Sequence, residues 1–242
     1  MSLLREALSL PAAATILWAA PLFAIGSWAA LGLAARLKQA GWKTGYTRKT
    51  FHFLTFGAAA AAQLAGGRPL LNLFGGATTL VLVYAIVRGA GHPLYEALAR
   101  EKDAPHRTWY IVVPYLATLA GGLCANALAG PAAVVCYLVC GIGDAVGEPF
   151  GTRFGRHPYR VPTPGRVVSY RSLEGSAAVA LCSWLAVLAG VATLGVPLTL
   201  PVCASAAGIA TIAAAIEGVA PHGGDNFFLI AVPALLSRLW LL

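Results

Sequence analysis

The chain has 242 residues, of which 58% are apolar and only 11% are charged, and its mean hydropathy is +0.73. Soluble domains carry about a quarter charged residues, so this composition excludes a soluble enzyme, a secreted disulfide scaffold and a disordered chain. The net charge of +8 is explained by a positive-inside bias, and we expect no nucleic-acid partner. The composition predicts an integral membrane protein.

Uncharged stretches of the chain predict where it crosses the membrane. A helix needs about 20 residues to cross about 30 Å of hydrocarbon, so the uncharged run 108–143 is too long for one span and is expected to turn at Gly130 and Pro131. The predicted spans are, in chain order, about 11–35, 51–66, 69–87, 109–128, 131–150, 174–195, 198–216 and 227–242. The second and eighth are short. The predicted fold class is therefore all-α, a polytopic membrane helix bundle of about 7–8 transmembrane helices, forming a single integral membrane domain over residues 1–242.

Basic residues gather in three of the predicted connections, 36–50, 88–108 and 151–173, which hold 14 of the 17 Lys and Arg residues. All three connections lie on one side of the membrane if eight spans are drawn. The positive side is the cytoplasm. We expect a multi-pass protein of a bacterial inner membrane, with both termini facing outward.

Five of the nine acidic residues lie at or inside predicted helix ends near this cytoplasmic face; the other four are in the N-terminal tail or the 88–107 loop, where a solvated role is expected. The five are Asp144, Glu148, Glu174, Glu217 and Asp225. An ionisable group at membrane depth is costly unless it is paired, which makes it a functional candidate. Converging carboxylates opposite many Arg residues suggest a site for a metal ion and a polyanion.

The segment from Gly143 to Gly155 combines two acidic residues with glycines spaced four apart. Asp144 and Glu148 share one helix face, and the glycines Gly143, Gly147, Gly151 and Gly155 lie next to that face. Glycines at this spacing allow close helix packing. Alternatively, a backbone without side chains admits phosphates while the carboxylates hold Mg²⁺ against them, and the two acidic residues favour this second interpretation.

Three shorter segments carry the remaining candidates. Ser172 and Glu174 suit the N-cap and first turn of the sixth span, or Arg171 and free amides there bind an anion. Arg48 and Lys49 open the second span as either a membrane anchor or phosphate ligands, with His52 inside the apolar run that follows. The connection 217–226 has two carboxylates and no Lys or Arg, which suggests metal ligands or partners for Arg side chains.

Together these segments resemble the polyprenol kinase family, which includes dolichol, phytol and farnesol kinases and CTP-dependent diacylglycerol kinases. The matching pieces are Arg48-Lys49-x-x-His52, Gly143-Asp144 with the spaced glycines, Arg171-Ser172-Leu173-Glu174-Gly175-Ser176, and Glu217 with Asp225-Asn226. They occur in the family's order, and the central segment is the most specific. Many members have Lys where Arg171 stands and a small residue where Glu148 stands.

The resemblance implies a lipid kinase that moves the γ-phosphoryl group of CTP, or of another nucleotide, to the hydroxyl of a membrane-embedded isoprenoid alcohol or diacylglycerol. The catalytic segments 48–52, 143–176 and 217–226 would then face the cytoplasm. Expected nucleotide or phosphate ligands are Arg48, Lys49, Gly143, Gly147, Arg171, Ser172, Gly175 and Asn226. Expected Mg²⁺ ligands are Asp144 and Asp225 with Glu148 in support. Asp144 is also an expected catalytic residue, with either Glu174 or His52 accepting the proton.

Two other functions are weighed against this one. The central segment resembles phosphatidate cytidylyltransferases more loosely, which implies a CDP-lipid synthase; those enzymes differ in having a Lys before the Asp that corresponds to Asp144. An ion-coupled transporter is expected to carry acidic residues through the bilayer midplane and broken helices in repeated halves. Here the acidic residues cluster at one face and no repeat is visible, which disfavours the transporter.

Overall fold

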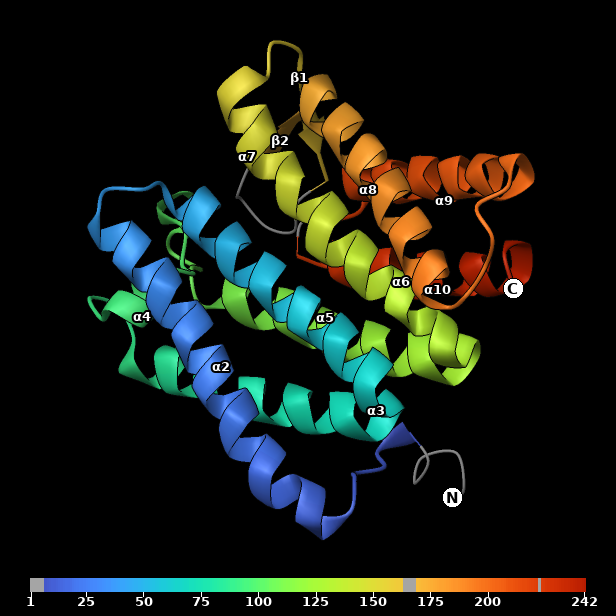
Figure 1. The fold of residues 1–242 in the computed structure, drawn as a ribbon. Helices are drawn as coiled ribbons and strands as arrows, with labels where there is room; N and C mark the ends of the chain where they lie inside the picture. Colours follow the sequence, from blue (N-terminus) through green and yellow to red (C-terminus); the bar gives the residue numbers. More distant parts are fainter. Residues whose placement is uncertain (1–6, 163–168, 222) are drawn as a thin grey trace. The chain divides into compact units, whose positions relative to one another are not determined.

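The computed structural model describes residues 7–162, 169–221 and 223–242, most of them helical (Figure 1). Glu6, Arg166 and His222 lie outside these ranges. The chain divides into two compact units, an N-terminal unit (Met1–Ile111) and a C-terminal unit (Val112–Leu242).

The N-terminal unit is built on two long helices, α2 (Ala13–Gln39) and α3 (Thr44–Arg88). The α3 helix is interrupted at Gly66 and Gly67, where the backbone leaves helical geometry and Gly67 has a φ of +61°. Beyond this break, α3 runs parallel to α2. Phe23 of α2 lies edge-on to Phe74 of α3, and one turn further along both helices Ser27 Oγ is 2.9 Å from Thr78 Oγ1.

The chain therefore reverses direction at the α3 break. A short connection joins α2 to α3, so the first part of α3 runs back along α2. Asn72, just beyond the break, then donates hydrogen bonds of 2.9 Å to the carbonyls of Ala7 and Ser9, near the start of α2. Glycine is suited to this turn because a residue with a Cβ is strained at a positive φ.

The connection after α3 is folded, although the sequence predicted a solvated loop there. It contains the short helix α4 (Pro93–Glu96) and the 3₁₀ turn η1 (Glu101–Asp103). Arg100 and Asp103 form a buried ion pair, with Nε 2.8 Å from Oδ2. Arg107 Nη2 is 2.5 Å from Glu96 Oε2. These pairs give the basic connection a fixed structure of its own.

The C-terminal unit contains five apolar helical stretches in succession. The first is α5 (Trp109–Ala129), which starts at the end of the N-terminal unit, and the second combines α6 (Ala133–Leu138), the π-helical η3 (Val139–Asp144) and α7 (Ala145–Phe154). The 3₁₀ turn η2 (Gly130–Ala132) joins these two, and Asn126 Nδ2 donates to Tyr137 Oη across the turn at 2.7 Å. The other three are α8 (Leu173–Thr193), α9 (Leu200–Val219) and α10 (Asp225–Trp240).

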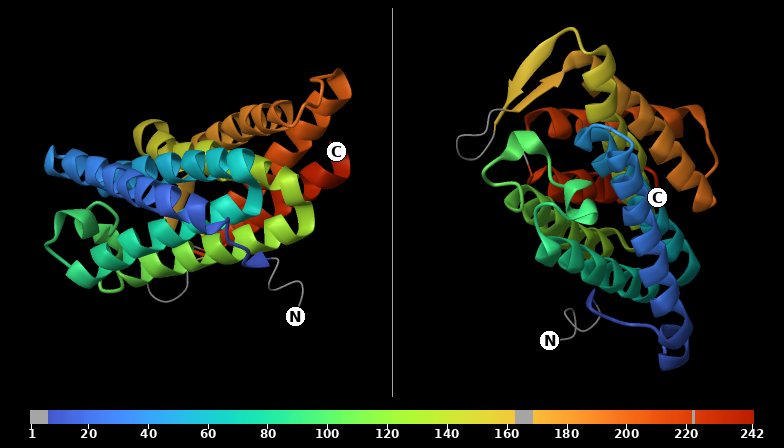
Figure 2. Two further views of the ribbon diagram at one scale, coloured as in Figure 1. Left: turned by 60° about the horizontal axis from the view of Figure 1, so that its bottom comes forward. Right: turned by 90° about the vertical axis from the view of Figure 1, so that its left-hand side faces the viewer.

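A two-stranded antiparallel hairpin follows α7, so the described residues form a nearly all-α fold, as predicted, with one small sheet added. Strand β1 (Pro158–Val161) pairs with β2 (Ser169–Ser172), with Tyr159 opposite Arg171. Figure 2 shows the hairpin at the end of α7 and α8. The segment contains alternating aromatic, basic and β-branched residues, a pattern that favours strands and that the high Arg content obscured.

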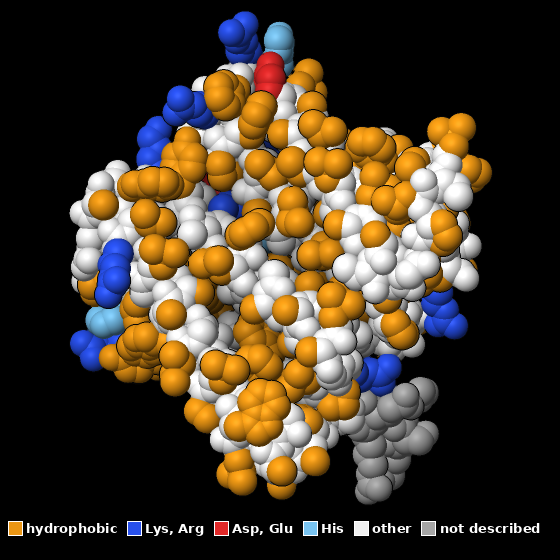
Figure 3. Space-filling view, in the orientation of Figure 1, with side chains coloured by type: hydrophobic (Ala, Val, Ile, Leu, Met, Phe, Trp, Pro, Cys, Tyr) orange, Lys and Arg blue, Asp and Glu red, His pale blue; other side chains and the backbone are white. Residues whose placement is uncertain are grey.

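Five stretches are long and apolar enough to cross a membrane: Ala13–Gln39, Thr44–Arg88, Trp109–Phe154, Leu173–Thr193 and Leu200–Val219. Large hydrophobic side chains are exposed along them, including Leu17 and Leu80, which are 80% and 72% exposed. Hydrophobic side chains likewise dominate the surface seen in Figure 3. Such a surface is stable against lipid and not against water, so the structure agrees with a multi-pass membrane protein.

Candidate functional site

The central feature of the C-terminal unit is an ion cluster in which one arginine contacts two carboxylates from different helices. Arg171 Nε lies 2.7 Å from Glu217 Oε1, and Arg171 Nη2 donates to Asp225 Oδ2 at 2.8 Å. The three side chains are 15%, 8% and 13% exposed. Charges this far removed from water are stable only when they are paired.

Three separate elements bring the cluster together. Arg171 is on β2, Glu217 is in the last turn of α9, and Asp225 is the first residue of α10. The negative charge of Asp225 also suits the N-terminal end of its helix. The predicted segments 171–176 and 217–226 are therefore brought into direct contact, although the 40 residues 177–216 separate them along the chain.

The hairpin positions Arg171. Its cross-strand neighbour Tyr159 shares the same hairpin face, and Tyr159 Oη lies 2.7 Å from Ser176 Oγ on α8. A Cβ at Gly218 would lie 3.0 Å from the same hydroxyl, so Tyr159 also reaches the end of α9. The sequence predicted no role for Tyr159, although its place in an alternating segment indicates a strand there.

The four spaced glycines face the rest of the C-terminal unit. A Cβ at Gly143 would lie 2.1 Å from Ser183 Oγ, and one at Gly147 would lie 2.8 Å from Val179 and 3.7 Å from Glu217 Oε1. A Cβ at Gly151 would lie 2.9 Å from Ser172 Oγ, and Gly155 meets the same hydroxyl. Close packing of η3 and α7 on α8 therefore accounts for these glycines, and it places Gly147 beside Glu217.

Ser172 begins α8 as its N-cap, which is one of the two roles that the sequence suggested, and Gly175 lies in the first turn. Ser172 is the N-cap, and its Oγ accepts a hydrogen bond of 3.1 Å from the Gly175 amide. A Cβ at Gly175 would lie 2.9 Å from the Gly147 carbonyl oxygen, so glycine is required for this close approach. Both residues contribute to the contact between α7 and α8.

Glu174 is held by the turn that precedes the hairpin. Its carboxylate accepts hydrogen bonds from the backbone amides of Arg156 and His157, at 3.0 and 3.3 Å, and contacts His157 Nδ1 at 2.6 Å. This arrangement ties the hairpin to the first turn of α8. Glu174 therefore positions the start of the hairpin against α8. The sequence predicted a possible role as a base but not this contact.

Asn226 is directed toward α5. Its Nδ2 donates to Thr118 Oγ1 at 2.9 Å and to the Pro114 carbonyl at 3.3 Å. These bonds use both amide hydrogens and fasten the start of α10 to α5. Asn226, a predicted nucleotide ligand, therefore has hydrogen-bond partners within the C-terminal unit.

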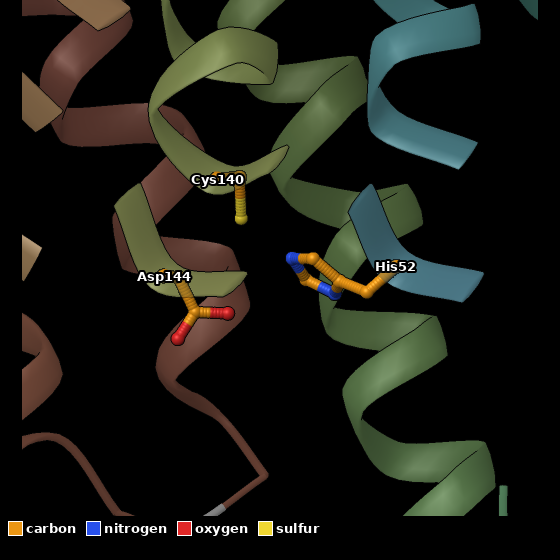
Figure 4. A group of neighbouring side chains, drawn as sticks. All are labelled: His52, Cys140 and Asp144. Atoms are coloured by element: carbon orange, nitrogen blue, oxygen red, sulfur yellow. The ribbon is translucent and has the colours of Figure 1, made fainter. Parts of the chain in front are cut away.

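Asp144 is buried, with 4% of its surface exposed, at the point where π-helical η3 meets α7. A carboxylate oxygen of Asp144 lies within 4.8 Å of Cys140 Sγ, and both side chains can be seen on η3 in Figure 4. Short π-helical segments inside α-helices are frequent at functional sites. Glu148, one turn further along, is partly exposed.

The remaining predicted residues belong to the N-terminal unit. Arg48, Lys49 and His52 lie in the first turns of α3. Lys49 is 8% exposed, and the His52 ring is 4.5 Å from that of Phe56, one turn on. His52 also appears in Figure 4, on α3.

Three ionisable side chains in the folded connection of the N-terminal unit have shifted pKa values. The hydrogen bond from Arg107 lowers the pKa of Glu96, and the same bond raises the pKa of Arg107. Burial raises the pKa of Glu101, but hydrogen bonds from Lys38, from its own backbone amide and from Thr44 together outweigh burial and leave this pKa below its usual value. Both carboxyl groups are therefore ionised at neutral pH and remain paired with their basic neighbours.

Comparisons with family models, with curated proteins and with solved structures found no match for this chain.

Proposed function

We propose that this protein is a membrane lipid kinase, which transfers the γ-phosphoryl group of CTP or another nucleoside triphosphate to the hydroxyl of an isoprenoid alcohol or diacylglycerol. The observation that carries the proposal is the ion cluster of Arg171, Glu217 and Asp225, with the Gly147 backbone beside it. These residues come from three segments of the polyprenol kinase resemblance, and they are adjacent only in the folded chain.

The donor set suits a divalent cation. Mg²⁺ prefers carboxylate oxygens, and Glu217 and Asp225 already receive the positive charge of Arg171 between them. Asp144 and Asp225 are the proposed ligands, with Glu148 in support and Glu217 added from the structure. When bound, Mg²⁺ would neutralise charge on the nucleotide phosphates.

The protein's own residues supply positioning and positive charge. In phosphoryl transfer these are the dominant tasks. Arg171 is proposed to bind the transferred group, together with Arg48 and Lys49. Because the Glu174 carboxylate is occupied by the turn at 156–157, His52 is the better candidate to accept the proton of the lipid hydroxyl.

The proposed topology has eight spans. The reversals at the α3 break and at η2 each divide one long apolar stretch into two, and α10 supplies the last. All the basic connections then face the cytoplasm, where the nucleotide is available. The lipid hydroxyl would reach the same face from within the bilayer.

The test is transfer of label from γ-³²P-CTP and, separately, from α-³²P-CTP to a panel of lipids incubated with the purified protein in detergent. We expect label from the γ position alone, in a prenol or in diacylglycerol. Label from the α position would instead establish the CDP-lipid synthase. Absence of transfer from both, and from ATP, would contradict either enzyme and favour the transporter.

A further inference from the structure

Arg171 lies between Glu217 and Asp225, which is where the proposed function places a cation. Its Nε and Nη2 face Glu217 and Asp225. Its third nitrogen, Nη1, is buried and has no hydrogen-bond partner in the part of the chain that the structure describes. Nη1 carries two N–H donors, and a buried donor without a partner is unfavourable. The arrangement therefore leaves part of the hydrogen-bonding capacity of the guanidinium group unused.

A guanidinium group and a divalent cation compete for the same carboxylate oxygens. Carboxylates near the membrane need a positive charge close by, and Arg171 supplies one in the free protein. While its two nitrogens lie 2.7 and 2.8 Å from the acidic oxygens, the guanidinium group repels a metal ion and weakens its binding to those oxygens. The planar guanidinium group is equally suited to bind phosphate with two parallel hydrogen bonds.

We propose that Arg171 is a placeholder for the divalent cation. In the free protein it neutralises Glu217 and Asp225; when the cation binds these two residues, Arg171 is released and its nitrogens become available to the nucleotide phosphates. The inference rests on the proposed function for the identity of the ligands, and it adds an order of events. The free protein binds the cation weakly, and cation and nucleotide strengthen each other's binding.

The hairpin provides the means for this exchange. Arg171 is on a two-stranded element, whereas both carboxylates are on helices that pack within the unit. The hairpin is fastened at one end by Glu174 and along its length by Tyr159. Because these contacts do not involve the guanidinium group, Arg171 can change partners without displacing the strand.

The test is Mn²⁺ binding to the full-length protein in detergent without nucleotide, measured by the loss of the free Mn²⁺ signal in electron paramagnetic resonance. Arg171→Gln removes the competing charge and is expected to tighten Mn²⁺ binding about ten-fold or more. Arg160→Gln is the matched control, since Arg160 is an exposed residue of the same hairpin, and it is expected to leave the affinity unchanged. Adding Glu217→Gln to Arg171→Gln should abolish the gain.

An Arg171→Gln protein that binds Mn²⁺ no more tightly than the wild type overturns the placeholder. If that variant fails to fold, Arg171→Lys replaces it, because an ammonium group reaches one carboxylate at a time. The lysine variant is expected to tighten binding by about two- to three-fold, and an unchanged affinity overturns the proposal equally. The assay uses no lipid or nucleotide, so its failure is distinguishable from a failure of the kinase proposal, which label transfer tests.

Discussion

The acidic residues that the sequence singled out have different surroundings in the folded chain. Asp225 and Glu217 contact Arg171, Glu174 accepts backbone hydrogen bonds, and Asp144 is buried at a π-helical segment. An acidic residue that ties two backbone segments together has a structural reason to be present. An ionisable residue at membrane depth is a functional candidate, so Asp144 stays a predicted site residue.

At the same scale, Asp144→Asn is expected to lower the rate of γ-phosphoryl transfer by about 10²–10³-fold or more, because it removes a negative charge that the proposed cation needs. The amide has nearly the same shape, so membrane insertion and the thermal unfolding midpoint should change little. Glu101→Gln, at an exposed position in η1, is the control and should retain activity. Full activity of purified Asp144→Asn would refute the assignment.

Among the elements, the contact of η3 and α7 with α8 shapes the candidate site. Glycines allow the two backbones to approach closely, and the same approach places Gly147 beside Glu217. The hairpin then joins the ends of α7 and α8 and carries Arg171 to the acidic residues. The site is thus a consequence of how these helices pack.

Gly143→Ala tests this contact. A Cβ would lie 2.1 Å from Ser183 Oγ and 3.2 Å from its Cα, so the substitution is expected to destabilise the protein by about 1–3 kcal/mol through overpacking. The thermal unfolding midpoint in detergent measures the effect. Gly75→Ala, in α3 with nothing within 4 Å of the added carbon, is the matched control; an equal midpoint for both variants would show that the contact is unimportant.

The folded connection around α4 predicts an acid dependence of stability. The pKa of Glu96 in the folded protein lies below its usual value of 4.5, chiefly because Arg107 donates a hydrogen bond to it. The group therefore contributes stability above pH 4.5 that is lost as the pH falls through the lower, folded pKa. Glu96→Gln should lower the unfolding midpoint at neutral pH and flatten its decline in acid. A variant whose midpoint follows the wild-type curve throughout would exclude a contribution from this pair.

At the scale of the whole molecule, the distribution of charge predicts the orientation in the membrane. In a cysteine-free background, single cysteines replacing Tyr170 and Leu198, both well exposed, are expected to react with a membrane-impermeant maleimide from opposite sides. Position 170 should be labelled only in inverted vesicles and position 198 only in right-side-out vesicles, because the proposed topology places the basic connections in the cytoplasm. Labelling of both from one side would rule out the eight-span topology.

The helices could be predicted from the sequence alone because an apolar run long enough to cross a membrane has few alternatives to a helix. The turns at Gly66, Gly67 and Gly130 were predictable for a similar reason, since glycine marks the places where the backbone leaves helical geometry. The hairpin was missed because its short strands lie in a segment dominated by Arg, and strand pairing depends on a partner elsewhere in the chain.

The candidate site, like the fold, could be predicted only in part from the sequence. Its residue types and segments were recognisable locally, since acidic and basic residues stand out in an apolar chain. Only the tertiary structure decided that Arg171 pairs with Glu217 and Asp225, that Glu174 fastens the hairpin, that Asn226 binds α5 and that the glycines face α8. Each of these depends on a partner that packing brings close from a distant part of the chain, and spacing along the sequence does not specify which partner that is.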